Sequence, residues 1–232
     1  MQAFFTYSQV AYKNSNMPRN DLPHLLILAS SWLLFGISHS MLAGSRLDSI
    51  FGRYGRLVFN GVAVVMTAIP LTISSSLPVI LLWKEPNWLH WIRHGISLIA
   101  ALSFLYTLKF YSIPGFLGLN AETWPLTFSQ WHRWVRHPWY FLLLILIWSQ
   151  TMTETWLVSA LCMTLYLMLG SKIEEKRILR LHHNSYADYC KIVPGLIPWR
   201  GRALDEATRL RLESQALTES GSPISILLSE KL

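Results

Sequence analysis

The sequence predicts an all-α membrane protein, a polytopic bundle of about five transmembrane helices, and three observations lead to this prediction. Of the 232 residues, 52% are hydrophobic and only 14% are charged, a balance that is unusual for a soluble domain. Apolar stretches recur at the length needed to cross a bilayer. The formal net charge of +7 comes from basic residues beside these stretches, where they orient helices and meet anionic lipid head groups. The charge therefore indicates membrane lipid as a partner and not nucleic acid.

The first three spans are expected in the N-terminal half of the chain. The first is Pro23 to Leu42, about 20 residues and long enough to cross a bilayer. The second runs from Leu57 to about Trp83, and Pro70 and the serines at 74–76 are expected to kink or interrupt it. The third is Trp88 to Tyr111.

Two shorter apolar stretches are predicted to form a helical hairpin, Pro138 to Gln150 and Trp156 to Gly170. Each arm has roughly 13 to 15 residues and is about 20 Å long. The second arm is expected to continue unbroken to His183 as one helix of about 30 residues, which projects beyond the bilayer as a cytoplasmic extension.

The C-terminal part is predicted to leave the membrane. Two prolines and a glycine in 193–199 rule out a regular helix there. This stretch, with Tyr186 and Tyr189 before it, is expected to form a re-entrant cap that closes over a site, and the alternative is a strap on the surface. A weak amphipathic pattern from Leu204 to Leu217 indicates either an interfacial helix or a partly disordered tail.

Positive charges predict the orientation, because the first and third connections and the segment after the hairpin are rich in Lys and Arg and the others are poor in them. The N-terminus is expected outside, and the C-terminus and both charged ends of the hairpin in the cytoplasm. The predicted division is an N-terminal arm at 1–22, one integral-membrane domain at 23–199 whose half at 131–199 holds the cofactor site, and a polar tail at 200–232.

A basic cluster, Arg136-His137-Pro138-Trp139-Tyr140, begins the hairpin. Proline is favoured at the first helical position, so the helix is expected to start at Pro138 with unpaired backbone N–H groups that attract an anion. Arg136 and His137 lie just outside this end, where a carboxylate or phosphate would bind. The alternative is that Arg136 meets lipid phosphate and His137 hydrogen-bonds a loop carbonyl.

An acidic cluster ends the hairpin. Gly170 and Glu174 are four residues apart on one helix face, so a ligand could lie against the glycine backbone beside a carboxylate that suits an ammonium group. Glu175 is rotated by about 100° and is expected to pair with Arg or Lys. The alternative is a solvated face of Glu, Lys and Arg.

His39 is an ionisable residue within the first span and is therefore a functional candidate. The alternative is a neutral histidine bonded to a neighbouring helix.

Cys162 and Cys190 are far apart and are expected to be structural, with no disulfide framework and no metal cluster. Motifs of soluble nucleotide-binding folds are absent, so a cofactor has to bind on membrane helices and their extensions.

These clusters together resemble the membrane methyltransferase superfamily. The pattern is Arg-His-Pro-x-Tyr, an apolar hairpin, Glu-Glu-x-x-Ile-Leu, Tyr-x-x-Tyr and a proline-bounded end, and it covers Trp131 to Trp199. The superfamily includes isoprenylcysteine carboxyl methyltransferases, phospholipid N-methyltransferases and methanethiol S-methyltransferase-like proteins. The earlier part, with His39-Ser40-Met41-Leu42-Ala43 and Leu57 to Leu71, is similar to NnrU-type membrane proteins and to the methanethiol enzymes.

The resemblance implies an enzyme that transfers a methyl group from S-adenosylmethionine to a small or lipophilic acceptor, which could be a thiol, a carboxylate or an amine. It places the cofactor between two walls, with Arg136 and Glu174 as the candidates for catalytic roles. The residues expected to bind the cofactor are Arg136, His137, Pro138, Tyr140, Gly170, Glu174, Glu175 and Tyr189. Two alternatives remain: an NnrU-like haem protein or isomerase with His39 as a haem ligand, and a non-catalytic membrane subunit on the same scaffold.

Overall fold

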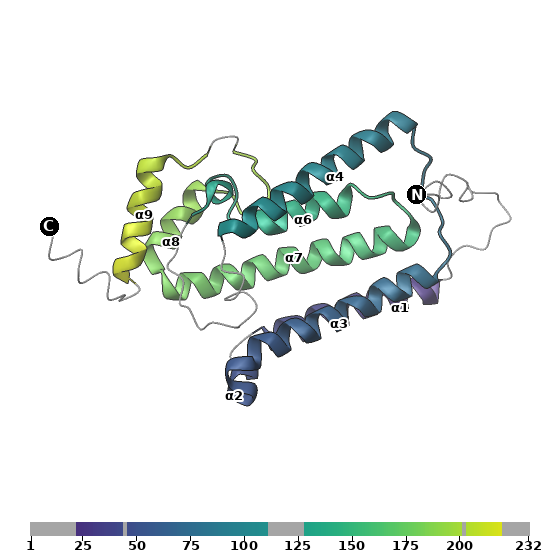
Figure 1. The fold of residues 1–232 in the computed structure, drawn as a ribbon, viewed down its shortest axis with the longest axis horizontal. Helices are drawn as coiled ribbons and strands as arrows, with labels where there is room; N and C mark the ends of the chain where they lie inside the picture. Colours follow the sequence, from purple (N-terminus) through teal and green to yellow (C-terminus); the bar gives the residue numbers. More distant parts are fainter. Residues whose placement is uncertain (1–21, 44–45, 111–127, 201–202, 220–232) are drawn as a thin grey trace.

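The computed structural model describes residues 22–43, 46–110, 128–200 and 203–219, and within these ranges the chain is helical with a single isolated β-bridge (Figure 1). The predicted all-α membrane bundle is confirmed. The N-terminal arm before residue 22, most of the third connection and the tail after residue 219 lie outside the described residues.

Two long helices form the N-terminal pair. Helix α1 covers Leu22–Leu42, and a short helix α2 (Arg46–Phe51) and a 3-10 turn η2 (Gly52–Tyr54) lead from it to α3 (Gly55–Ser76). Gly52 adopts a φ of +55° in this connection, a left-handed conformation that glycine reaches at no steric cost. The chain therefore reverses here, and α1 and α3 pack side by side (Figure 1).

The second predicted span was too long, but the helix ends at the serines at 74–76 that were predicted to interrupt it, while Pro70 lies inside the helix. Helix α3 ends at Ser76, whereas the hydrophobic pattern predicted a helix to about Trp83. Leu77 has an extended backbone (φ −88°, ψ 153°), as expected for a residue that precedes a proline, because the ring of Pro78 clashes with a helical conformation. The following chain is non-helical, and Leu81 forms the β-bridge with Thr153 in the hairpin turn.

Helix α4 (Asn87–Thr107) continues into a 3-10 turn, η3 (Leu108–Phe110), close to the predicted third span. It is tied to the hairpin at both ends. Arg93 forms an ion pair of 2.6 Å with Glu85 and donates to the Ser149 carbonyl at 2.7 Å. At the other end, the indole of Trp139 donates to the Thr107 hydroxyl at 2.8 Å.

The predicted hairpin is confirmed as α6 (Pro138–Trp148) and α7 (Glu154–Leu181), preceded by a 3-10 turn, η4 (Gln130–Arg133). Thr153 caps α7 by accepting a hydrogen bond of 3.0 Å from the Trp156 N–H. The 28 residues of α7 run through Gly170 without a break, which confirms the single long helix. At the α1 interface, the Trp32 indole donates to Ser159 at 3.0 Å.

Two further helices, α8 (His183–Ile192) and α9 (Glu206–Glu219), cover one end of the bundle. Residues 193–199 contain no helix, as predicted, whereas Tyr186 and Tyr189, which were assigned to the same cap, lie on the helix α8. The two helices enclose a hydrophobic cluster: Phe128, Tyr186, Tyr189, Val193, Leu204 and Leu212. The Glu219 carboxylate accepts hydrogen bonds from the backbone N–H groups of Asn184 and Ser185 and from the Ser185 hydroxyl, so α9 is clamped to the start of α8.

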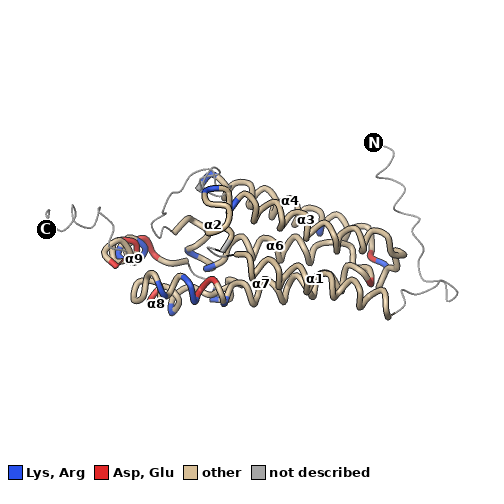
Figure 2. Tube along the Cα trace, turned by 90° about the horizontal axis from the view of Figure 1, so that it is seen from below, with Lys and Arg blue, Asp and Glu red and all other residues tan. Residues whose placement is uncertain are grey.

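The exposed surface of the helices is apolar. Val64 on α3 is 70% exposed and Trp91 on α4 is 73% exposed, which is costly in water but favourable in lipid. Three helical segments are long and apolar enough to cross a membrane, fewer than the five predicted: Leu22–Leu42, Ser49–Ser76 and Glu154–Leu181. Helix α6 is apolar but shorter. Charged residues gather at the ends of the bundle, chiefly around α2, α8 and α9 (Figure 2).

Replacing Gly36 with alanine should loosen the contact between α1 and α7. An added Cβ would lie 3.1 Å from Cδ2 of Tyr166, whereas a Cβ at Gly61 on α3 meets nothing within 4 Å. Overpacking of this kind costs about 1–3 kcal/mol. Gly36→Ala should therefore lower the midpoint of thermal denaturation in detergent, and Gly61→Ala should not. Equal midpoints for the two variants would contradict this packing.

Candidate active site

An ion pair joins the two sequence clusters at the α8 and α9 end of the hairpin. Arg136, just before α6, donates through Nε (2.9 Å) and Nη2 (2.7 Å) to Oε1 of Glu175 on α7. Both side chains are nearly buried, with exposures of 11% and 12%. A pair shielded from water in this way is much less screened than one on the surface. The predicted pairing of Glu175 with a basic residue is thus what the geometry shows.

Arg136 also fixes the segment after α8. Its Nη1 donates to the carbonyls of Cys190 (3.1 Å) and Val193 (2.6 Å), so four of its five N–H groups bond to the protein. Its backbone N–H donates to the Pro194 carbonyl at 2.9 Å, and that of His137 donates to Gly195 at 3.2 Å. Residues 193–198, which we call the strap, therefore lie across the start of α6.

Gly195 allows the strap to approach this ion pair. A Cβ at this position would lie 3.3 Å from Nη2 of Arg136 and 3.8 Å from Oε1 of Glu175. Any larger side chain would push the strap away from the charged groups, because a separation of 3.3 Å is tighter than ordinary van der Waals contact. The glycine thus has a steric role that its place between two prolines did not by itself reveal.

His137 connects both carboxylates of the acidic cluster. Its Nε2 lies 3.1 Å from Oε1 of Glu175, and its Nδ1 lies 3.4 Å from Oε2 of Glu174. The imidazole is buried and stacks on the ring of Tyr140, with centroids 5.3 Å apart and planes 13° from parallel. Tyr140 also interacts electrostatically with Glu174. The carboxylate is held in place on one side, but 46% of the Glu174 side chain is exposed.

Gly170 lies one turn before Glu174 and faces Tyr140. A Cβ added to Gly170 would meet only the Tyr140 hydroxyl, at 3.9 Å, which is ordinary contact. The backbone of α7 is therefore open between the glycine and the carboxylate. Pro138 is buried at the first position of α6, and no side chain caps that helix end, so its first N–H groups form a local positive end.

Tyr189 is placed differently from the other predicted site residues. It is 1% exposed within the hydrophobic cluster, where its ring lies 4.2 Å from that of Phe128. Its hydroxyl donates to the His132 carbonyl at 2.6 Å. Tyr189 therefore ties α8 to the loop that carries Arg136 and His137.

Two residues near this site were not singled out from the sequence. Tyr166 lies on α7 one turn before Gly170 and interacts electrostatically with Glu174 and Tyr140. The spacing of 166, 170 and 174 puts all three on one helix face, and this periodicity was the available signal. His132 approaches from the preceding loop, where its Nδ1 lies 2.8 Å from the Ser129 hydroxyl; nothing in the sequence distinguished it from other interfacial histidines.

The groups around the ion pair are kept in their neutral forms. Burial raises the pKa of the Cys190 thiol, and it raises the pKa of the Tyr186 phenol. Burial also lowers the pKa of His132 from 6.5 to about 4, with His137 acting in the same direction and Glu174 opposing it. The buried ion pair of Arg136 and Glu175 therefore has neutral groups around it, with the charges of Glu174 and Lys172 beside Glu175.

The lowered pKa of His132 predicts a loss of stability in mild acid. Below pH 6.5 the unfolded chain binds a proton that the folded chain does not, so stability falls as the pH decreases from about 6.5 to about 4 and is flat above that range. The loss should be on the order of 2 kcal/mol. Thermal denaturation measured across this pH range checks the prediction. His132→Gln should reduce the dependence of stability on pH, and an unchanged dependence would contradict a buried neutral ring.

Part of the chain is similar to known proteins. The chain is 34% identical over 86 residues to methanethiol S-methyltransferase of Crocosphaera subtropica. It is 34% identical over 70 residues to methanethiol S-methyltransferase 1 of Bradyrhizobium diazoefficiens, and 37% identical over 68 residues to methanethiol S-methyltransferase of Pseudomonas deceptionensis. Over these segments the chain is similar to proteins named methanethiol S-methyltransferases.

The similarity is partial in length. It covers 36%, 30% and 29% of this chain, and 34%, 25% and 26% of the three relatives. The chain thus spans about a third or less of the methyltransferases that it matches. No protein-family model matches it, and no solved structure does. The predicted membrane methyltransferase resemblance is confirmed, and the likeness of the first half to NnrU-type proteins stays a prediction.

Proposed function

We propose that the protein is an integral-membrane methyltransferase that uses S-adenosylmethionine and methylates a small thiol. The observation that carries the proposal is the half-exposed carboxylate of Glu174, fixed by His137 and Tyr140 beside the open backbone at Gly170. The names of the three relatives support a small thiol acceptor, in preference to the carboxylate or amine that the sequence left open.

The residues present fit a donor that carries separate positive and negative groups. A carboxylate next to aromatic rings suits an ammonium or sulfonium cation, and Glu174 with Tyr140 and Tyr166 provides this combination. The uncapped start of α6 at Pro138 suits a carboxylate. When bound, S-adenosylmethionine supplies an electrophilic methyl group whose transfer needs no metal.

Arg136 has a positioning role in this proposal, because Glu175 and two carbonyls take up four of its N–H groups. Together with His137 it holds the strap over the site, and Glu175 balances its charge. The protein then contributes orientation of the two reactants and exclusion of water, which are the effects that an in-line displacement requires most. The proposed orientation keeps this site and the C-terminus on the cytoplasmic side.

Binding of S-adenosylmethionine by protein in lipid nanodiscs tests the proposal, together with conversion of methanethiol to dimethyl sulfide measured by headspace gas chromatography. The sharpest variant is Gly170→Ala, because the fold has room for this methyl group. We expect it to weaken donor binding at least tenfold by calorimetry. Gly95→Ala on α4, where a Cβ meets nothing within 4 Å, is the matched control.

Two outcomes would overturn the proposal. One is wild-type protein that binds no S-adenosylmethionine and forms no dimethyl sulfide. The other is equal donor affinity in Gly170→Ala and Gly95→Ala, which would mean that no ligand lies against the α7 backbone at this point.

A further inference from the structure

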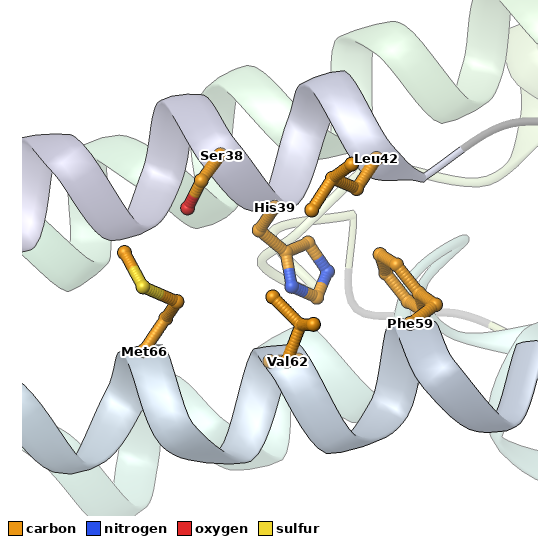
Figure 3. A pocket seen from close by; sticks show the side chains of 7 residues that line it. Ser38, His39, Leu42, Phe59, Val62 and Met66 are labelled. Carbon is orange, nitrogen blue, oxygen red and sulfur yellow. The ribbon is translucent and has the colours of Figure 1, made fainter. Parts of the chain in front are cut away.

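A second candidate site lies between α1 and α3, beside Tyr166 of α7. Its lining residues come from two helices: Ser38, His39 and Leu42 on α1, and Phe59, Val62, Ala63 and Met66 on α3. Figure 3 shows how His39 and Leu42 face Phe59, Val62 and Met66 across this pocket. The lining is apolar apart from Ser38 and His39. The Ser38 hydroxyl donates to the Phe35 carbonyl at 3.0 Å, so the imidazole provides the available polar atom.

The His39 ring has an unusual environment. Its Nδ1 is buried and has no hydrogen-bond partner, while aromatic rings surround it: Phe59 at 4.7 Å, Phe35 at 5.4 Å and Tyr166 at 5.8 Å between centroids. A buried polar atom without a partner costs about 1–3 kcal/mol, and most such atoms in folded proteins are paired. In the tautomer that carries its proton on Nε2, this nitrogen is an acceptor, and a ligand that donates one hydrogen bond would satisfy it.

Tyr166 separates this pocket from the donor site. Its ring meets the edge of His39 in a near-perpendicular contact (85°), and the same residue interacts electrostatically with Glu174. Gly36 makes this position possible, because a side chain there would collide with the Tyr166 ring. A molecule bound beside His39 would therefore contact the ring of Tyr166, and this ring would have to turn aside before the sulfur could reach the methyl group, because the transfer requires the two reacting atoms to be about 3–3.5 Å apart.

We infer that this pocket binds the methyl acceptor, a small apolar thiol that enters from the lipid and donates its S–H to Nδ1 of His39. The inference rests on the proposed function. A short alkyl thiol has the two properties that the lining selects: an apolar body for Leu42, Phe59 and Met66, and one weak donor for the imidazole. The pocket is narrow, and the flexible side chain of Met66 at one end (Figure 3) can move to admit a ligand.

The lining residues of this pocket include no second histidine. The rings of Phe35, Phe59 and Tyr166 already occupy the faces and edge of the imidazole. The pocket thus favours a small acceptor over the alternative of a haem group held by His39.

Filling the pocket is the first test. Ala63→Phe places a ring among its lining residues, whereas Val64→Phe adds the same ring to the neighbouring lipid-facing position, which is 70% exposed. We expect Ala63→Phe to raise the KM for methanethiol at least tenfold, with the dissociation constant of S-adenosylmethionine unchanged, and Val64→Phe to change neither. Equal KM values in the two variants would overturn the inference.

The second test is independent of turnover and of the variant's stability. In wild-type protein labelled with ¹⁵N-histidine, the His39 resonance is identified by its loss in His39→Leu. We expect methanethiol, added without S-adenosylmethionine, to shift that Nδ1 resonance, and an equal concentration of propane to leave it in place. An unmoved resonance would overturn the inference, as would an equal shift with propane, since this would indicate occupation by any apolar molecule or acyl chain.

The two tests also separate this inference from the proposed function. A wild-type protein that methylates methanethiol normally but shows none of these pocket effects refutes the acceptor pocket alone. A wild-type protein that neither binds S-adenosylmethionine nor methylates thiols refutes the proposed function, whatever the His39 resonance does.

Discussion

Replacing Glu174 with glutamine should weaken the binding of S-adenosylmethionine by about 10–100-fold, because a hydrogen bond between charged groups contributes about 1.5–3 kcal/mol. The carboxylate presents its exposed side to the site while His137 and Tyr140 hold the other side. Glutamine keeps the shape and loses the charge, so the ammonium group of the donor would lose its counter-ion. Calorimetry in nanodiscs measures the change.

The thermal stability of Glu174→Gln should stay close to that of the wild type, since 46% of this side chain is exposed. Glu206→Gln is a suitable control: this carboxylate is 56% exposed at the same end of the bundle and pairs with Arg209 on α9. If both variants bound S-adenosylmethionine as tightly as the parent, Glu174 would not contact the donor.

Replacing Glu175 with glutamine should act on stability, which Glu174→Gln leaves unchanged. We expect it to lower the free energy of unfolding by about 3 kcal/mol. The change leaves the guanidinium of Arg136 nearly buried without its counter-charge, and His137 loses the negative charge that lies 3.1 Å from its Nε2. Denaturation of the purified protein should show this loss even when no ligand is present.

A double-mutant cycle with Arg136→Met isolates the ion pair. We expect a coupling energy of about 2 kcal/mol between Arg136 and Glu175, so that Arg136→Met/Glu175→Gln is more stable than the sum of the single changes implies. Additive effects would contradict a direct interaction. The strap should also become accessible to protease in the single variants, because Arg136 joins Glu175 to the Cys190 and Val193 carbonyls.

The elements that local sequence rules could predict are those determined by short-range forces. Helix α7 has no proline or turn residue to stop it at Gly170, and it runs unbroken. Pro138 begins α6 because its missing N–H costs nothing at the first helical position. By contrast, the second span was predicted to extend too far, to Trp83. The apolar residues after Ser76 favoured a longer helix, whereas Pro78 stops it.

The parts that escaped prediction depend on long-range contacts. The sequence indicated that Glu175 would take a basic partner but could not choose between the nearby lysines and arginines and Arg136, which is distant along the chain. The helical form of α8 depends on packing of Tyr186 and Tyr189 against Phe128 and Leu212. The contact of His39 with Tyr166 likewise requires α1 and α7 to be adjacent, which no local pattern encodes.

The clamp of Glu219 on Asn184 and Ser185 has a consequence for how the protein is made. The spans that the structure describes all precede this residue in the chain, so they are synthesised before the last turn of α9. The contact that anchors α8, and with it the strap, can therefore form only after these spans have left the ribosome. If the protein acts as proposed, the strap over the donor site would be anchored only once these spans have been made.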